Sequence, residues 1–311
     1  MTMFILRRIG TMLVTMFALT FVVFYLVNLP GNLEKIAKTE GNMRMTDAEV
    51  QAWLDAEGYG RPFFTRYAEW VTNTVQGDMG YSRVFREPVA EVVGERLYYT
   101  GILMFWVMIV MVPGALIIGV LAGMREGSPL DRSLSVGSIA STSAPEYVTG
   151  IIFVVIFSSA LGIFKGIAST RTITFENFTL PVLTMAIYGM GYIARMTRAS
   201  MAEVMTSQYI RTATLKGMDF RMVVLKHALR NALIAPFTVI MLQFPWLLTG
   251  VVVVETMFNF KGFGWTLVQA AGNNDIELLL AISWIAVIIV LATQLISDIG
   301  YAFLNPRIRV S

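Results

Sequence analysis

The chain has 311 residues, of which 56% are hydrophobic and 14% charged, with a mean hydropathy of +0.64. A water-soluble domain does not show this balance, so the composition predicts an integral membrane protein. The small formal charge of +3, spread over many loops, argues against nucleic-acid binding. With no cysteine and one histidine, thiolate and multi-histidine metal sites are excluded, and no Walker phosphate loop is present.

The first apolar run covers residues 9–33 and follows Arg7 and Arg8 directly. It is long enough for a membrane-spanning helix, which needs about 20 residues. The basic residues before it place the N-terminus in the cytoplasm. A cleavable signal peptide is the competing interpretation, but the run is too long and lacks a small-residue cleavage site before Pro30. We therefore predict that residues 1–33 form a cytoplasmic N-terminus and the first span.

Residues 34–96 are polar and carry helical signals of their own, which predict a helical extracytoplasmic region. Thr46 and Glu49 have the spacing of a capping box, and Gly58 ends the helix that they start. A second helix begins near Pro62, carries an aromatic stripe and stops at Gly77. The stripe is compatible with packing on the membrane surface and with docking of a partner.

Residues 97–311 contain five further charge-poor runs of membrane-spanning length. They cover residues 97–124, 133–164, 177–194, 231–254 and 278–297. Thirteen basic residues fall in the segments assigned to the cytoplasm, against three in the two short outer loops. The positive-inside rule then favours six spans with both termini in the cytoplasm.

Two acids belong to these runs. Glu146 lies about 12 residues into the third span, which places it ~18 Å deep in a ~30 Å core. It should face the bundle interior or water, or bond to backbone groups freed by Pro145. Glu255 lies about 22 residues beyond Leu233, or ~33 Å along the fifth helix, at its outer mouth. There it could belong to an outer gate, meet a binding protein, or be a solvated helix end.

The longest polar interruption in the second half of the chain covers residues 208–236. Its cations face only Asp219, so charge asymmetry places it in the cytoplasm. We expect one helix, with Ile210 and Ala213 on one side, to end at Gly217, and Asp219 to cap a second helix. The cations are Arg211, Lys216, Arg221, Lys226 and Arg230, and the inner face of the second helix would be Val223, Val224, His227 and Ala228. A basic segment attracted to anionic lipid is the alternative.

The same residues carry a family resemblance. Tyr209–Ala213 with Lys216-Gly217, and then His227–Ala232, resemble the cytoplasmic coupling loop of ABC-importer permeases, most closely the oligopeptide/dipeptide/nickel branch. Of the family's Glu-Ala-Ala-x-x-x-Gly motif, this sequence keeps Ala213 and Gly217 and has Arg211 and Thr212 in the first two places. The stretches 143–150, 255–264 and 305–309 are also similar to the family. The resemblance covers nearly the whole chain and is weakest around residues 31–45.

The resemblance implies an all-α type I ABC importer permease in a bacterial or archaeal inner membrane. The coupling loop would be 199–232, and its ATPase-contacting residues would be Tyr209, Ile210, Arg211, Thr212, Ala213, Lys216, Gly217 and Met218. Candidates for the passage or gate are Pro145, Glu146, Tyr147, Gln243 and Glu255. Gln243 begins a Gln-Phe-Pro-Trp stretch where the family usually has a glycine-rich segment.

The partners that the resemblance implies are a second homologous permease, two ATPase subunits, an extracytoplasmic solute-binding protein and membrane lipid. This chain would bind no cofactor and catalyse no reaction, because ATP and Mg would lie on the ATPase subunits. The solute would be a di- or oligopeptide, a nickel complex, a sugar or an opine. A different class of function remains open, namely an ion channel or secondary transporter that uses Glu146 and Glu255. A membrane enzyme ranks lowest, since no nucleophile, base and orienting group recur at recognisable spacing.

Overall fold

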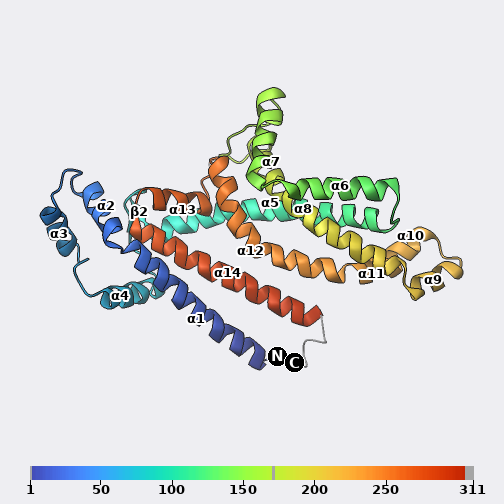
Figure 1. Cartoon of the computed structure of the whole chain (residues 1–311), viewed down its shortest axis with the longest axis horizontal. Helices are drawn as coiled ribbons and strands as arrows, with labels where there is room; N and C mark the ends of the chain where they lie inside the picture. Colours follow the sequence, from blue (N-terminus) through green and yellow to red (C-terminus); the bar gives the residue numbers. More distant parts are fainter. Residues whose placement is uncertain (1, 170–171, 305–311) are drawn as a thin grey trace. The chain divides into compact units, whose positions relative to one another are not determined.

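The computed structural model describes residues 2–169 and 172–304, which are almost entirely helical (Figure 1). The chain divides into two compact units. Unit 1 comprises Met1–Tyr98 and Trp265–Ala292, and unit 2 comprises Tyr99–Gly264 and Thr293–Ser311. The resemblance at 305–309, with Arg307 and Arg309, lies outside the described residues.

Unit 1 holds the first span and the polar region that follows it. Its elements are α1 (Thr2–Val27), α2 (Pro30–Glu40), α3 (Asp47–Ala56), α4 (Phe63–Val75), the antiparallel strands β1 (Tyr81–Ser82) and β2 (Glu87–Pro88), and parts of α5 (Val89–Gly123), α13 (Phe263–Gly272) and α14 (Ile276–Leu304). The capping box is confirmed, because the Glu49 carboxylate accepts from the Thr46 amide at 2.7 Å while the Thr46 hydroxyl accepts from the Glu49 amide at 3.4 Å. Gly58 and Gly77 follow α3 and α4 with positive φ, as expected for helix ends.

The first span ends at Val27, so its predicted end at residue 33 is wrong. Pro30 occupies the first turn of a new helix, α2, because its fixed φ suits that position. The next apolar residues therefore face the core of unit 1: Leu33, Ile36 and Ala37 are buried there.

The aromatic stripe of α4 packs within unit 1. The Phe63, Tyr67 and Trp70 rings lie 5.3–5.6 Å from the Phe24 ring on α1. Trp70 also meets Trp284 of α14 edge-on at 5.6 Å. The stripe thus holds the polar region against the first and last spans.

Unit 2 contains the remaining helices. They are the rest of α5, α6 (Pro129–Ser143), α7 (Glu146–Phe153), a π-helical stretch (Val154–Ala160), α8 (Phe175–Met205), α9 (Gln208–Leu215), α10 (Phe220–Met222), a second π-helical stretch (Val223–Ala228), α11 (Leu229–Ala232), α12 (Ile234–Met257) and the end of α14. Helix α8 is central and contacts α6 and α12 (Figure 1). A Cβ at Gly123 would lie 2.5 Å from the Arg198 carbonyl, and one at Gly191 would lie 2.5 Å from the Ser138 carbonyl. Glycine therefore lets α5 and α6 approach α8 closely, as small residues do between membrane helices.

Three described helices are long and apolar enough to cross a membrane: Leu6–Val27, Val89–Gly123 and Ile276–Ile299. Two bent pairs raise the number to five if each pair is one span, Pro129–Ser143 with Glu146–Ala160 and Phe220–Ala232 with Ile234–Leu248. The fourth expected span lies within α8, which continues eleven residues past position 194 to Met205.

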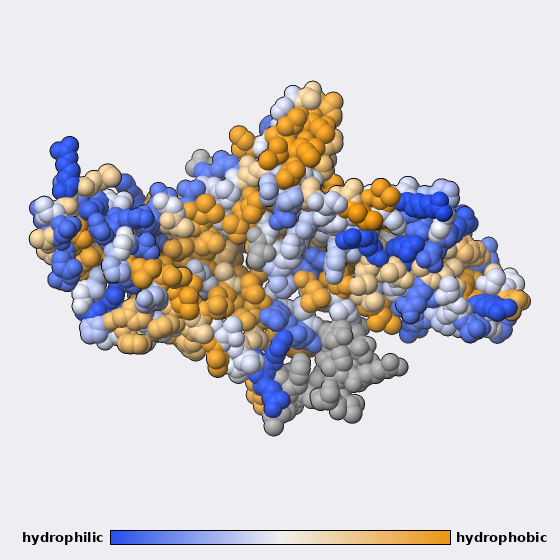
Figure 2. All heavy atoms as spheres, viewed as in Figure 1, coloured by the Kyte–Doolittle hydropathy of each residue, from blue (hydrophilic) through white to orange (hydrophobic). Residues whose placement is uncertain are grey.

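The third expected span is not one continuous helix. Its two halves meet at an angle of 102°, because Pro145 disfavours helical geometry at the preceding residue and Ala144 is extended. The residues counted for the depth of Glu146 lie mostly in α6, before the bend, and that depth stays a prediction. Helix α7 and the π-helical stretch after it, which follow the bend, expose Ile151, Ile152 and Val155, and Figure 2 shows apolar residues gathered there. Such a surface suits lipid or another membrane helix.

Candidate functional site

The polar segment between α8 and α12 forms a helical hairpin (residues 208–232), here called the basic hairpin. Helix α9 ends at Leu215, and Gly217 takes a φ of +78°. The Gly217 amide donates to the Thr214 carbonyl at 3.0 Å and the Met218 amide to the Ala213 carbonyl at 3.4 Å. This pair of bonds is a Schellman motif, so the predicted helix end at Gly217 is confirmed.

The return arm of the basic hairpin starts at Asp219, whose carboxylate accepts from the Arg221 amide at 3.0 Å, as predicted. Helices α10 and α11 flank the second π-helical stretch in this arm. π-Helical turns are rare and occur frequently at functional sites. The predicted inner face is also found, with Val223, Val224 and Ala228 buried and His227 half-buried.

The inner faces of both arms join one apolar cluster at the end of α8. Its buried members are Met201, Ile210, Ala213, Val223, Val224, Ala228 and Ala232. Two polar contacts add to it: the Ser200 hydroxyl donates to the Ala232 carbonyl at 2.8 Å, and the Asn231 amide donates to the Tyr209 hydroxyl at 3.0 Å. The hairpin is therefore fixed to α8 and can pass a displacement to it.

Burial sorts the predicted ATPase-contacting residues into two groups. Tyr209, Arg211, Thr212, Lys216 and Gly217 are exposed, and Met218 is half-buried. Ile210 and Ala213 are buried in the chain's own cluster, and their contact with an ATPase stays a prediction. They present the inner face of α9, and their role is to hold the hairpin in place.

Sequence reasoning missed the exposed apolar residues of the basic hairpin. Leu215 is 79% exposed, Leu225 68% and Met222 52%. The available signal was the presence of large apolar residues among cations in a short loop. Exposed apolar side chains ringed by charges mark a surface for another protein.

A second missed feature joins the turn between α5 and α6 to α8. Asp131 is 2% exposed and receives two hydrogen bonds from the Arg198 guanidinium, from Nε at 3.0 Å and from Nη2 at 2.8 Å. The Gly127 amide and the Ser135 hydroxyl donate to the same carboxylate at 2.8 and 3.1 Å. A two-point pair of this kind fixes orientation as well as distance. We call it the Asp131–Arg198 clasp.

Three passage candidates lie on or against α12. Gln243 and Glu255 both belong to this helix and are buried. Glu146 is half-buried at the start of α7, and a Cβ at Gly250 would lie 3.1 Å from its carboxylate. Glu146 therefore faces α12, in agreement with a position inside the bundle.

The passage candidates do not converge on one site. The twelve residues from Gln243 to Glu255 separate their levels by ~18 Å along α12. Pro145, at the bend, and Tyr147, on α7, are exposed. Glu146 approaches α12 at Gly250, between these two levels, and an ion site built jointly from Glu146 and Glu255 stays a prediction.

Glu255 is fully buried, so its interpretation as a solvated helix end is wrong, and its contact with a binding protein stays a prediction. The Thr100 hydroxyl donates to its carboxylate and accepts from the Phe263 amide at 2.8 Å. Through the Thr100 hydroxyl, the carboxylate therefore links the turn between α12 and α13 to α5. A gating role for Glu255 stays a prediction.

We expect Thr100→Val to destabilise unit 2, because the isosteric side chain removes the hydroxyl that satisfies both Glu255 and the Phe263 amide. The Phe263 amide would lose the Thr100 hydroxyl as its partner, and a buried polar group left without a partner costs about 1–3 kcal/mol. The matched control is Thr256→Val, since Thr256 is exposed and its hydroxyl donates to the Val252 carbonyl of its own helix. Thermal unfolding of the purified chain in detergent measures both. Equal unfolding temperatures for the two variants would contradict this link.

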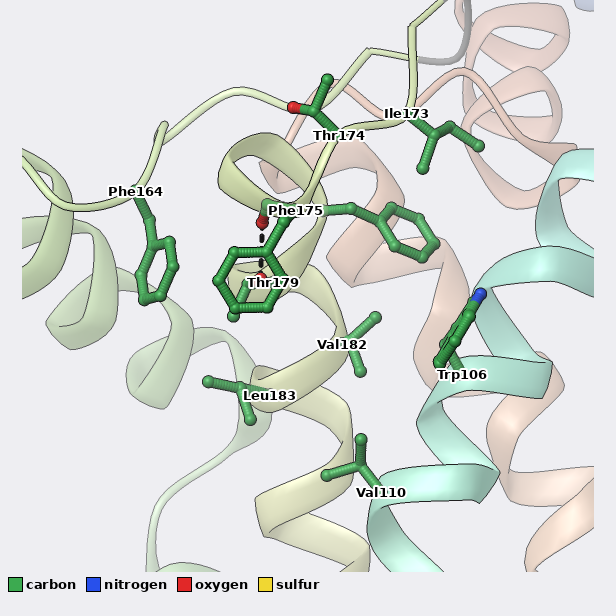
Figure 3. Close-up of a pocket in the computed structure, with 10 residues that line it drawn as sticks. Trp106, Val110, Phe164, Ile173, Thr174, Phe175, Thr179, Val182 and Leu183 are labelled. Atoms are coloured by element: carbon green, nitrogen blue, oxygen red, sulfur yellow. Dashed lines mark hydrogen bonds between the residues drawn. The ribbon is translucent and has the colours of Figure 1, made fainter.

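Unit 2 also contains an apolar cavity of ≈ 620 Å³ between α5, α8 and the segment before α8 (Figure 3). The Trp106, Phe164 and Phe175 rings lie around it, with Val182 and Leu183 along one side. None of the passage candidates lines it. Among the described residues, its walls offer shape and apolar contact and no group that could carry charge.

Residues 115–310 match the family model described as "Binding-protein-dependent transport system inner membrane component". The chain is 32% identical over 313 residues to the glutathione transport system permease protein GsiC of Escherichia coli (strain K12), with 98% of each protein covered. It is 33% identical to the oligopeptide transport system permease protein AppB of Bacillus subtilis (strain 168), over 85% of this chain and 86% of that protein. A solved chain described as "Crystal structure of an amino acid ABC transporter with histidines" is similar in fold, with a TM-score of 0.53 and 16% identity over 68% of this chain and 94% of that one.

Proposed function

Because this chain belongs to the family of binding-protein-dependent transport system inner membrane components, we propose that it acts with a second permease, two ATPase subunits and a solute-binding protein. The chain itself is a transport permease with a helical membrane fold and not an enzyme. In the proposed assembly, ATP and Mg lie on the ATPase subunits, and the two permeases enclose the passage.

The basic hairpin is the observation that carries the proposed coupling. It combines an ordered turn at Gly217, exposed cations and exposed apolar side chains with a firm attachment to α8. ATP binding would close the ATPases and displace this hairpin, and the displacement would favour an outward-facing arrangement of the bundle. Such a shift requires that the ATPases contact the hairpin differently in the two states.

We propose short peptides as the solute class. Two relatives that cover most of the chain are named for glutathione, a small peptide, and for oligopeptides. Glu255 of α12 is hydrogen-bonded within the chain and Glu146 of α7 faces α12, so both acids favour a structural part in a passage for larger solutes over an ion path.

Affinity purification of the tagged chain in mild detergent tests this proposal. We expect two ATPase subunits and a second permease to copurify, and the binding protein to retain a peptide. A chain that purifies alone, and whose membranes transport an ion without any ATPase, would refute it.

We propose further that both termini face the cytoplasm, which the distribution of basic residues supports. A reporter active only outside the membrane is expected to work when fused within residues 40–90 or near Asn273. The same reporter should be silent near Gly127 or after Arg309. Activity at either of the last two positions would overturn the orientation.

A further inference from the structure

Unit 1 contains a polar cavity of ≈ 310 Å³ that the importer function does not use. It lies among α1, α4, the turn before α4, the segment before β1 and the start of α14. Its volume reaches the range of small-molecule sites, about 300–1,000 Å³. Charged side chains of both signs line it, namely Arg61, Arg66, Glu57, Glu69, Asp78 and Glu277.

Arg66 is the distinctive group of this cavity. Its Nη1 donates to the Asn28 side-chain oxygen at 2.5 Å and its Nε donates to the Arg61 carbonyl at 3.2 Å. The guanidinium carbon lies 5.7 Å from the centre of the Tyr59 ring. These contacts hold the guanidinium in one orientation with neutral groups.

Arg66 differs from the other cations of the region in its partners. Arg61 pairs with Glu69 at 2.7 Å and Arg83 with Glu57 at 3.7 Å, whereas no carboxylate among residues 2–169 and 172–304 forms an ion pair with Arg66. Burial lowers the pKa of Arg66 from its usual value and raises the pKa of the nearby Tyr59 hydroxyl to about 12, with Glu277 contributing to the second shift. A half-buried guanidinium held by neutral groups is a site for an external anion, because charge-assisted bonds to a carboxylate are strong.

Acidic groups on the same cavity are fixed by the backbone. The Glu277 carboxylate accepts from the Tyr81 amide at 2.5 Å, and the Asp78 carboxylate accepts from the Gly80 amide at 3.1 Å. A Cβ at Gly80 would lie 2.3 Å from the Glu277 oxygen, so glycine is needed for this approach. An anion alone would be repelled by these two acids, and a cation alone would leave Arg66 without a counter-charge.

We propose that this cavity binds a zwitterionic amino acid or short peptide, with the ligand carboxylate on Arg66 and its ammonium group at Glu277 and Asp78. The assignment rests on the charges of the cavity and not on the importer function, in which the binding protein selects the solute. In the proposed orientation the cavity opens on the outer side, where it would meet solute before the passage does.

The test uses the full chain purified in detergent without other subunits and isothermal titration with the dipeptide Ala-Ala. We expect saturable binding that weakens at least about tenfold when either the amino end is acetylated or the carboxyl end is amidated, as the loss of one charged hydrogen bond requires. Arg66→Gln should weaken Ala-Ala binding by a similar factor. Arg44→Gln removes an exposed arginine of the same region and should leave binding unchanged.

Pairing the variants with the blocked peptides keeps the proposal testable if Arg66→Gln folds poorly. Glu277→Gln can still accept from the Tyr81 amide, and in this variant acetylation of the ligand should cost much less than in the original chain. The site is overturned if Ala-Ala shows no saturable binding at concentrations about 100-fold above a Kd of ~0.1 mM. Equal binding of free and blocked peptides also overturns it. So does a result in which Arg66→Gln weakens only the association of a binding protein. Copurifying ATPases without Ala-Ala binding would reject this cavity site and leave the importer proposal standing.

Discussion

Gly217→Val is expected to abolish coupling between the ATPases and this chain while leaving membrane insertion intact. Gly217 has a φ of +78°, which an L-residue with a branched Cβ adopts at a cost of roughly 1–2 kcal/mol or more. No atom lies within 4 Å of a Cβ built at this position, so the strain comes from the backbone conformation and not from crowding in this chain. Loss of the turn would release the Gly217 and Met218 amides from their carbonyl partners. The measurements are ATPase copurification and solute-stimulated ATP hydrolysis.

Two control variants distinguish the effect of losing the turn from the effect of adding a side chain to a glycine. Gly217→Asn should retain most of the coupling, because asparagine tolerates the left-handed conformation better than other residues with a Cβ. Gly94→Val makes the same substitution at an exposed helical glycine of α5 with open space around its Cβ, and it should couple normally. If Gly217→Val transports solute and retains its ATPases, the basic hairpin is not the coupling element, and its attraction to anionic lipid becomes the better account.

Asp131→Asn is expected to give the largest loss of stability among single substitutions in the turns of unit 2. The amide keeps the shape of the carboxylate but removes the charge that holds Arg198. Its NH₂ group is a donor and so cannot accept a hydrogen bond from the guanidinium or from the Gly127 amide. Breaking a buried pair costs about 3–5 kcal/mol, and the 30% exposure of the Arg198 side chain reduces this to roughly 2 kcal/mol. Unfolding of the chain in detergent, followed with ATP-driven uptake, measures the effect.

Glu126→Gln is the matched control for the Asp131–Arg198 clasp. Glu126 also approaches Arg198, at 3.4 Å, but its side chain is 56% exposed. An exposed ion pair contributes about 0–1 kcal/mol, so this variant should be nearly as stable as the original chain. Equal destabilisation by the two substitutions would show that Arg198 has a general need for negative charge and that the clasp geometry is unimportant.

Short-range signals in the sequence predicted local structure well. Thr46 with Glu49 marked a helix start, and Gly217 with Asp219 marked the hairpin turn, because each motif satisfies backbone groups within a few residues of itself. Alternation of apolar runs and basic loops likewise located the long helices. These features depend on residues that are neighbours along the chain.

Features that depend on tertiary contacts could not be predicted in this way. Asp131 and Arg198 are 67 positions apart, and Thr100 and Glu255 are 155 apart, so neither pairing leaves a local pattern. Glu255 was predicted to lie at the outer end of a helix. Counting residues along α12 does not reveal that the turn between α12 and α13 covers the Glu255 side chain. The bend at Pro145 was visible as a proline, but its angle of 102° is set by packing in unit 2.

Uptake of peptide by reconstituted membranes tests the central claim most directly. The labelled peptide that copurifies with the binding protein is added to proteoliposomes containing this chain, the second permease and both ATPase subunits. We predict accumulation only when ATP and the binding protein are both present, and no accumulation with Gly217→Val. Accumulation that follows an imposed ion gradient, without ATP or ATPase subunits, would contradict the importer account.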